Sequence, residues 1–396
     1  MQWRKNLWFL SIGAFINNIG FTAVLPFFPA FLVEMGLKEN ISMWSGLIIS
    51  VNFLAAGLMS PVWGSFADRY GKRIMLARSG FGMVVTYILI AMATNHWQLL
   101  IYRTLNGLLA GFIAASIMLV VSTTPQERMG YALGIINTFI AAGSILGPFF
   151  GGTLVQYLGI RPTMFAAAGV LLAGTVLGYY GTKEKVVKQI KKTTLLEDLG
   201  LVLKNRGLRV YFLAITVLQI TTFMIVPTLP LHVAELTSHN TELLTGILFS
   251  VVGISMAIGS AQIYRINKLS NSAILLASLL LCGILSVLQG LTSSLLILGL
   301  TRFFFGFVYA GVNVSGNVLI TQCSGEEMRG RVFGILNSFT YFGAVIGPLL
   351  GGFMGQQLGN ASAFHGSALF FFVAAGVFWY YQRSLHKVQA NGVSVA

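Results

Sequence analysis

Gly143-Ser-Ile-Leu-Gly147-Pro148-Phe-Phe-Gly151-Gly152 is a stretch that this chain carries twice. The second copy starts two hundred residues later and reads Gly343-Ala-Val-Ile-Gly347-Pro348-Leu-Leu-Gly351-Gly352. Both copies lie late in a long apolar segment, where glycine and proline normally weaken a helix. Because such an unfavourable feature recurs at a fixed interval, the sequence indicates two similar halves.

The composition is typical of a membrane protein. Of the 396 residues, 56% are hydrophobic and only 9% are charged, whereas soluble domains carry about 25% charged residues. Apolar segments of about twenty residues recur along the chain, and each could cross a hydrocarbon core of roughly 30 Å. Strands of a membrane β-barrel would be shorter and would alternate in polarity. We therefore predict an all-α polytopic membrane protein.

We predict twelve transmembrane helices, arranged as two pseudo-symmetric six-helix bundles. The first bundle would comprise residues 1–181 and the second residues 209–382, with a basic linker at 182–208 and a tail at 383–396. The predicted spans are 7–33, 44–66, 74–94, 97–121, 131–156, 161–181, 209–233, 243–264, 272–290, 294–320, 331–356 and 362–382.

Lysine and arginine predict the orientation. Twenty-one of the 25 fall on one side of the membrane, Lys38 and Arg161 fall on the other, and Arg103 and Arg302 lie within spans. Since basic residues are retained in the cytoplasm, we expect both termini to be cytoplasmic. The net charge of +14 thus reflects topology, and we expect no nucleic-acid partner. Without an obvious targeting segment, the chain is expected in a bacterial inner membrane.

Corresponding residues recur in the two halves at offsets of 199 to 201. Glu34 corresponds to Glu235, and Arg103 corresponds to Arg302. Two halves of the same orientation, related by an axis along the membrane normal, are typical of transporters that bind substrate between the halves.

The loop after the second span combines glycines, an acid and a basic cluster. It reads Gly64-Ser-Phe-Ala-Asp68-Arg69-Tyr-Gly71-Lys72-Arg73. Asp68 can stabilise the N-terminus of a neighbouring helix, and the basic residues can anchor the loop at the membrane surface. We predict a conformational latch between the halves. The corresponding loop of the second half, Gly259-Ser-Ala-Gln-Ile-Tyr264-Arg265-Ile-Asn-Lys268, has no aspartate, so the latch should be asymmetric.

This loop resembles the signature G-x-x-x-D-R-x-G-R/K-R/K of the major facilitator superfamily. Arg103-Thr-Leu-Asn-Gly107, followed by Ala110-Gly111, resembles the family's fourth-helix motif, and Gly143–Gly152 resembles its antiporter motif. The resemblance covers the whole chain and favours the drug:proton antiporter branch. It implies a monomeric secondary transporter that works by alternating access without a cofactor. It also implies that the first glycine motif packs spans 5 and 8, and the second packs spans 11 and 2.

No carboxylate lies at mid-membrane in the predicted spans. Glu34 and Glu235 lie at the outer ends of spans 1 and 7, and Arg103 and Arg302 lie inside spans 4 and 10. A buried arginine needs a partner, and the resemblance places these four spans around the central cavity. We predict a Glu34–Arg103 pair and a Glu235–Arg302 pair that couple transport to protons. Alternatively, both glutamates are solvated and both arginines bind backbone carbonyls.

Uncharged polar and aromatic residues in the expected lining spans are candidates for the substrate cavity, since such sites suit amphipathic organic molecules. Packing between helices is the alternative for each of them. The candidates are Asn17, Asn18, Phe21, Asn137, Phe139, Gln219, Phe223, Tyr309, Asn313, Asn317, Asn337 and Tyr341.

The chemistry of the sequence favours transport over catalysis. We find no nucleophile–base arrangement, no metal-ligand spacing and no nucleotide-binding loop, and expect no metal and no cofactor. The leading hypothesis is export of small amphipathic organic compounds, driven by inward proton movement through alternating access. The expected partners are this substrate, protons and the lipid bilayer. The alternatives are movement of a lipid or of an anionic or neutral metabolite, and a membrane sensor or scaffold without transport.

Overall fold

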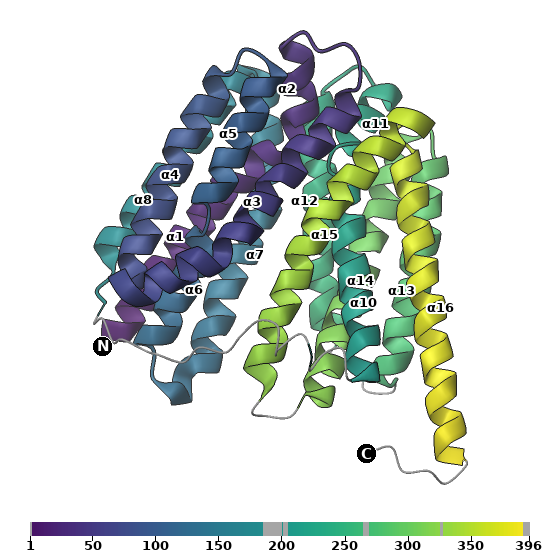
Figure 1. The fold of residues 1–396 in the computed structure, drawn as a ribbon. Coiled ribbons are helices and arrows are strands. Elements are labelled where there is room, and N and C mark those ends of the chain that lie inside the picture. The colour runs from purple at the N-terminus through teal and green to yellow at the C-terminus, as the bar shows by residue number, and fades with distance from the viewer. Residues whose placement is uncertain (1, 185–199, 201–204, 264–268, 325–327, 391–396) are drawn as a thin grey trace. The chain divides into compact units, whose positions relative to one another are not determined.

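The chain folds entirely into helices in a computed structural model that describes residues 2–184, 200, 205–263, 269–324 and 328–390 (Figure 1). Twelve helical segments within these ranges are long and apolar enough to cross a membrane. The predicted all-α polytopic architecture is therefore confirmed. Most of the predicted linker and residues 264–268 of the second-half loop lie outside the described residues.

Six spans make up the N-terminal half of the chain. In order, they are α1 (Gln2–Val24) with η1 (Leu25–Phe27) and α2 (Phe28–Glu34); α3 (Ile41–Tyr70); α4 (Lys72–Met92); α5 (His96–Leu109) with α6 (Phe112–Thr123); η2 (Gln126–Arg128) with α7 (Met129–Leu158); and α8 (Ile160–Gly181).

Six further spans follow the linker. They are α10 (Arg206–Met224) with α11 (Leu229–Leu236), α12 (Thr241–Ile263), α13 (Asn271–Leu291), α14 (Leu295–Cys323), α15 (Arg329–Leu358) and α16 (Ser362–Ala390). Helix α16 continues beyond residue 382, where we expected the tail to begin. The added segment, Arg383–Ala390, contains arginine, leucine, lysine, glutamine and alanine, which all favour a helix.

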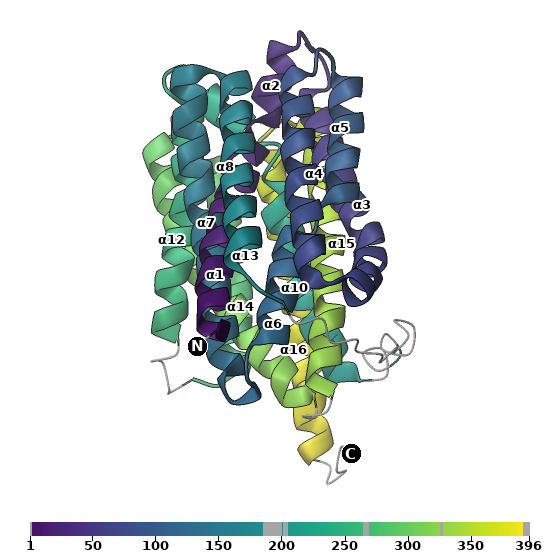
Figure 2. The ribbon, with the colours of Figure 1, turned by 90° about the vertical axis from the view of Figure 1, so that its left-hand side faces the viewer.

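The backbone contacts divide the chain into two compact units. The first comprises Met1–Lys191 and Val226–Ser250, and the second comprises Lys192–Ile225 and Val251–Ala396. In the first unit, α1 packs along α7 and α8, and α8 also packs along α4 (Figure 2). Helix α11 belongs to this unit because it packs against α2 and η1.

In the second unit, α10 packs against α14, α15 and α16, while α13 packs against α14 and α16. Their apolar faces form one buried cluster that contains Phe212, Cys282, Phe305, Phe371 and Phe378.

The sequence repeat is also visible in backbone conformation. Asn40 and Asn240 have φ angles of 57° and 53°, each just before a span, and Gly159 and Gly359 have φ angles of 84° and 86°. Apart from glycine, asparagine is one of the few residues that adopt this left-handed region readily. Both halves therefore use the same helix-boundary conformations two hundred residues apart.

Span 4 is broken, whereas its counterpart α14 is continuous. Gly111 adopts a φ of 135°, a conformation that residues with a side chain rarely take, and Ala310 occupies the corresponding position in α14. The break frees two carbonyl groups in the first unit. Trp63 Nε1 donates to the Leu108 carbonyl over 2.7 Å, and Arg78 Nη2 donates to the Ala110 carbonyl over 3.3 Å.

Candidate functional site

Arg103 is fully buried in the first unit. Its guanidinium carbon lies 4.7 Å from the centre of the Phe28 ring, and Nη1 lies 3.4 Å from Oδ1 of Asn106. Within the described residues, no acceptor meets its Nε and Nη2 atoms by hydrogen-bond geometry. The predicted Glu34–Arg103 ion pair is wrong, because Glu34 binds a different arginine.

Asparagines link the helices around Arg103. Asn52 Nδ2, on α3, donates to the Arg103 carbonyl over 3.0 Å and to Asn106 Oδ1 over 2.9 Å. Asn106 Nδ2 donates to Thr86 Oγ1 on α4 over 2.7 Å. A side chain on Gly107 would collide with the Asn52 carbonyl, so this glycine lets α5 approach α3. In the sequence Asn52 is a lone amide in an apolar span, a pattern that does not distinguish it from other polar residues in spans.

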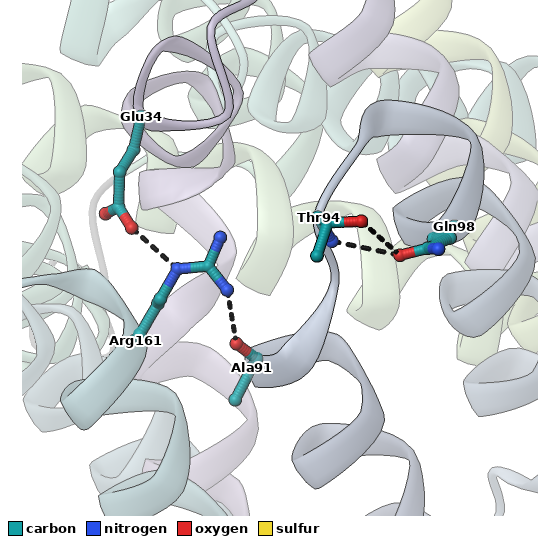
Figure 3. A network of polar contacts seen from close by, with 5 residues as sticks. All are labelled: Glu34, Ala91, Thr94, Gln98 and Arg161. Carbon is teal, nitrogen blue, oxygen red and sulfur yellow. Dashed lines mark hydrogen bonds and ion pairs between the residues drawn. The ribbon is translucent and has the colours of Figure 1, made fainter.

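Glu34 forms an ion pair with Arg161 at the end of α2 (Figure 3). Arg161 Nε donates to Oε1 over 2.8 Å, and Nη1 donates to the Ala91 carbonyl over 2.9 Å. The guanidinium carbon lies 5.2 Å from the centre of the Phe31 ring. Both charged side chains are part-exposed, at 35% for Arg161 and 43% for Glu34. Arg161 therefore joins α2 to the start of α8 and the end of α4.

Glu235, the corresponding glutamate of the second half, lies beside a histidine of its own helix. Nδ1 of His232 lies 3.2 Å from Oε2 of Glu235, one turn away on α11. The position that corresponds to Arg161 is occupied by Ala361, so no equivalent arginine is available there. Arg302 is buried in α14, and its predicted pairing with Glu235 stays a prediction.

The predicted latch loop turns at Gly71, whose φ of 100° joins α3 directly to α4. Glu184, at the start of the linker, accepts hydrogen bonds from the backbone N–H groups of Lys72 over 3.0 Å and Arg73 over 2.8 Å. This carboxylate caps the N-terminus of α4, where an anion is favoured by the helix dipole. The Arg73 side chain donates to the Tyr179 carbonyl over 2.9 Å and lies 4.2 Å from the Tyr179 ring centre.

The linker start is also bound to span 1. Asn6 Nδ2 donates to the Lys183 carbonyl over 2.8 Å, and the Lys183 N–H donates to Asn6 Oδ1 over 3.2 Å. Neither Asn6 nor Glu184 was a candidate from the sequence, since a polar residue at a span boundary gives no distinctive pattern.

Asp68 forms no ion pair with any residue that the structure describes. It is exposed in the last turn of α3, where the negative end of the helix dipole disfavours a carboxylate. Arg69 is also exposed, with its guanidinium carbon 5.3 Å from the Tyr70 ring centre, and a side chain on Gly64 would meet open space. This placement fits the predicted latch, which stays a prediction.

The two glycine motifs pack against equivalent helices of their own halves. A side chain on Gly143 would lie 2.7 Å from the Phe15 carbonyl of α1, and one on Gly343 would lie 2.6 Å from Gln219 of α10. Gly147, Gly151, Gly347 and Gly351 continue these two contacts, each next to a backbone carbonyl of the partner helix. Pro148 and Pro348 lie inside α7 and α15 without interrupting either helix.

Gly152 has a different neighbour. A side chain there would lie 2.5 Å from the Glu242 carbonyl and 3.1 Å from Cα of Gly246, both on α12. The packing of α15, including Gly352, against span 2 stays a prediction.

Several candidates for the substrate cavity lie in helix contacts. Asn18 Nδ2 donates to the Ile140 carbonyl over 2.7 Å and to Ser144 Oγ over 2.6 Å, which joins α1 to α7. Tyr309 is buried, and its hydroxyl accepts from Thr222 Oγ1 over 3.1 Å.

The remaining cavity candidates differ in exposure. Asn17 is buried; Asn137, Asn337 and Tyr341 are exposed; and Phe21, Phe139, Gln219, Phe223, Asn313 and Asn317 are part-buried.

Comparisons with known proteins agree with the fold. The protein family described as "Major Facilitator Superfamily" matches this chain over residues 10–270 and 212–394. Solved structures with a similar fold include a mutant of the nucleoside transporter NupG, with a TM-score of 0.80 at 15% identity over 95% of this chain and 99% of that one. A bacterial homologue of the human lysosomal transporter Spinster has a TM-score of 0.78 at 13% identity, over 95% and 96% of the two chains.

Two relatives in sequence are named multidrug resistance protein MdtG. The Yersinia enterocolitica protein is 33% identical over 99% of this chain and 97% of its own length. The Salmonella schwarzengrund protein is 33% identical over 95% and 93% of the two lengths. The chain therefore belongs to the Major Facilitator Superfamily, whose members are membrane transporters and not enzymes.

Proposed function

We propose that this chain is a proton-coupled exporter of small amphipathic organic compounds that works by alternating access. The observation that carries the proposal is the 33% identity, over almost the whole of both chains, to proteins named for multidrug resistance. The inner membrane of a bacterium, with both termini in the cytoplasm, is the proposed location, and protons are the proposed driving ion.

The geometry around Glu34 supports proton coupling. The ion pair with Arg161 is partly exposed, so protons from solution can reach the carboxylate. An ion pair of this kind contributes only about 0.2–1 kcal/mol, which is small enough to be formed and broken in each transport cycle. Protonation of Glu34 would remove the attraction and release Arg161.

The segment held by this ion pair is a short helix that is set off from the rest of span 1. Helix α2 is separated from α1 by the short η1 segment, which contains Pro26, and Pro29 lies in the first turn of α2. Proline has no N–H group to continue the hydrogen bonding of α1 through this point. Arg161 holds α2 through Glu34 and through the ring of Phe31. Release of Arg161 would therefore free the end of span 1, and we propose this step as the link between protonation and opening.

Arg103 supports the second candidate, transport of a lipid or an anionic metabolite. No carboxylate pairs with its buried guanidinium in the part of the chain that the structure describes. An arginine that lacks a counter-ion inside a membrane protein is a candidate for binding an anionic group.

A panel efflux assay in a transporter-deficient bacterial host separates these candidates. Cells that express the chain are loaded with unrelated amphipathic cations, and efflux is followed with and without a proton uncoupler. Energy-dependent efflux of several cations, abolished by the uncoupler, supports the first proposal. Failure to export every cation, together with flux of a lipid or an anion, supports the second.

A further inference from the structure

A pocket of about 420 Å³ lies at one end of span 1 and span 5, away from Glu34 and Arg103. Its lining residues are Trp3, Arg4, Leu7 and Trp8 from α1, with Arg128 and Tyr131 from η2 and α7. The four residues of α1 repeat at helical spacing and share one face. Because α1 packs along α7, this face of α1 forms one side of the pocket. The residues at η2 and the start of α7 form the other side.

Positive charge dominates this pocket. Arg4 and Arg128 are exposed, and neither guanidinium forms an ion pair within the described residues. The guanidinium carbon of Arg4 lies 5.4 Å from the Trp3 ring centre. Glu127 is the one nearby acid in sequence; it is exposed in η2 and does not line the pocket. The two arginines therefore present ten N–H donors to an anion.

The remaining lining residues suit the boundary of a membrane. Trp8 is 47% exposed and Tyr131 is 60% exposed, and both residue types concentrate where lipid headgroups meet the hydrocarbon core. The Trp8 ring packs edge-to-face with Phe139 on α7, with ring centres 5.9 Å apart. A soluble anion needs no such aromatic surface, whereas a phospholipid presents a phosphate and an apolar chain together.

We propose that this pocket binds the headgroup of an anionic phospholipid. Arg4 and Arg128 bind the phosphate, because the planar guanidinium matches phosphate oxygens in pairs. Trp3, Trp8 and Tyr131 pack against the glycerol and the first methylenes of the acyl chains. Basic pockets between transmembrane helices bind anionic headgroups in this way. The proposed site is independent of the transported substrate and of proton coupling.

Native mass spectrometry of the purified full chain tests the proposal. Phosphatidylglycerol and phosphatidylcholine with identical acyl chains are titrated against the native protein and against Arg4→Gln, Arg128→Gln and the double variant. We expect the native protein to prefer phosphatidylglycerol. Each substitution should weaken its binding roughly fivefold, and the double substitution about 25-fold if the effects add. Phosphatidylcholine binding should weaken much less, because its choline cation already offsets the charge of its phosphate.

Lys5→Gln is the matched control, because it removes one positive charge from the same end of α1 without touching the pocket lining. Arg4→Lys with Arg128→Lys keeps the charge and should retain most of the affinity. Melting temperatures of all variants establish that each is folded. The proposal is overturned if the double variant binds phosphatidylglycerol like the native protein, or if Lys5→Gln weakens binding as much as Arg128→Gln. Displacement of the lipid by millimolar inorganic phosphate would also overturn it, since that result identifies a soluble-anion site.

Discussion

At the residue scale, the most informative contact is the ion pair of Glu34 with Arg161. The carboxylate lies at the end of α2, and both partners are partly exposed to solvent. Arg103, in contrast, is fully buried and binds Asn106 of its own helix. The Glu34–Arg161 ion pair is therefore separate from the buried arginine of the fourth-helix motif.

We predict that Glu34→Gln reduces uncoupler-sensitive efflux roughly tenfold, an effect of about 1.4 kcal/mol on the limiting step. Glutamine can still accept a hydrogen bond from Arg161, but it cannot take up a proton. Efflux of a fluorescent substrate from loaded cells at several external pH values measures the effect. Glu39→Gln is the control, because Glu39 is exposed and acidic but forms no ion pair within the described residues. Efflux by Glu34→Gln that matches the native chain at every pH would refute a coupling role.

Glu184 gives a second prediction at this scale. Its carboxylate accepts two backbone N–H groups at the start of α4, so Glu184→Ala should destabilise the protein by about 0.5–2 kcal/mol, as the loss of a helix cap does. Glu184→Gln should fall between the alanine variant and the native chain. Thermal unfolding in detergent measures the change. Equal melting temperatures for Glu184→Ala and Glu39→Gln would show that the cap contributes nothing.

At the scale of elements, glycine positions determine how closely the helices approach. A side chain on Gly151 would collide with the Ala23 carbonyl of α1, and one on Gly351 would collide with the Met224 carbonyl of α10. Each contact joins the helix of a glycine motif to the first span of the same half. The glycine motif therefore allows close helix packing within each half. Gly152, in the first copy, also lies close to α12.

We predict that Gly151→Ala destabilises the protein by about 1–3 kcal/mol, because a methyl group must displace the α1 backbone. Gly134→Ala, on the same helix, provides the control, since a methyl group there meets open space. It should leave the melting temperature unchanged or raise it slightly, given that alanine favours a helix. Similar melting temperatures for the two variants would contradict the packing role.

The sequence was sufficient to predict the spans but insufficient to predict several contacts. Apolar length alone predicts the twelve spans, because the hydrocarbon core fixes the length of each helix. The partner of Glu34 depends instead on which helix ends meet, and the sequence does not show that the start of α8 lies beside α2. For the same reason the Glu184 cap and the Asn52 bridge were missed. The break in span 4 was also missed, although Gly111 supplied a signal for it.

At the scale of the whole molecule, the two halves share backbone conformations but not charges. Gly159 and Gly359 adopt the same turn, yet Arg161 corresponds to Ala361 and the second-half loop lacks an aspartate. A transport cycle built on these halves should therefore place its proton-sensitive and latching groups unequally, with more of them in the first half.

We predict that Asp68→Asn lowers transport without lowering stability. Asp68 is exposed at the unfavourable end of α3, so removal of its charge should leave the melting temperature unchanged or raise it slightly. Transport should fall several-fold if the carboxylate stabilises one of the two conformations between which the halves alternate. Efflux and thermal unfolding are measured on the same preparation. A loss of transport that only accompanies unfolding would contradict the latch.

Proton movement during transport tests proton-coupled export most directly. Inverted membrane vesicles that contain the chain are acidified by respiration, and a substrate identified by the efflux panel is added while a fluorescent probe reports the pH of the lumen. We predict that substrate raises the lumen pH in vesicles with the native chain, and that Glu34→Gln combined with Glu235→Gln abolishes this response. Accumulation of substrate in the native vesicles without a change in lumen pH would contradict proton-coupled export.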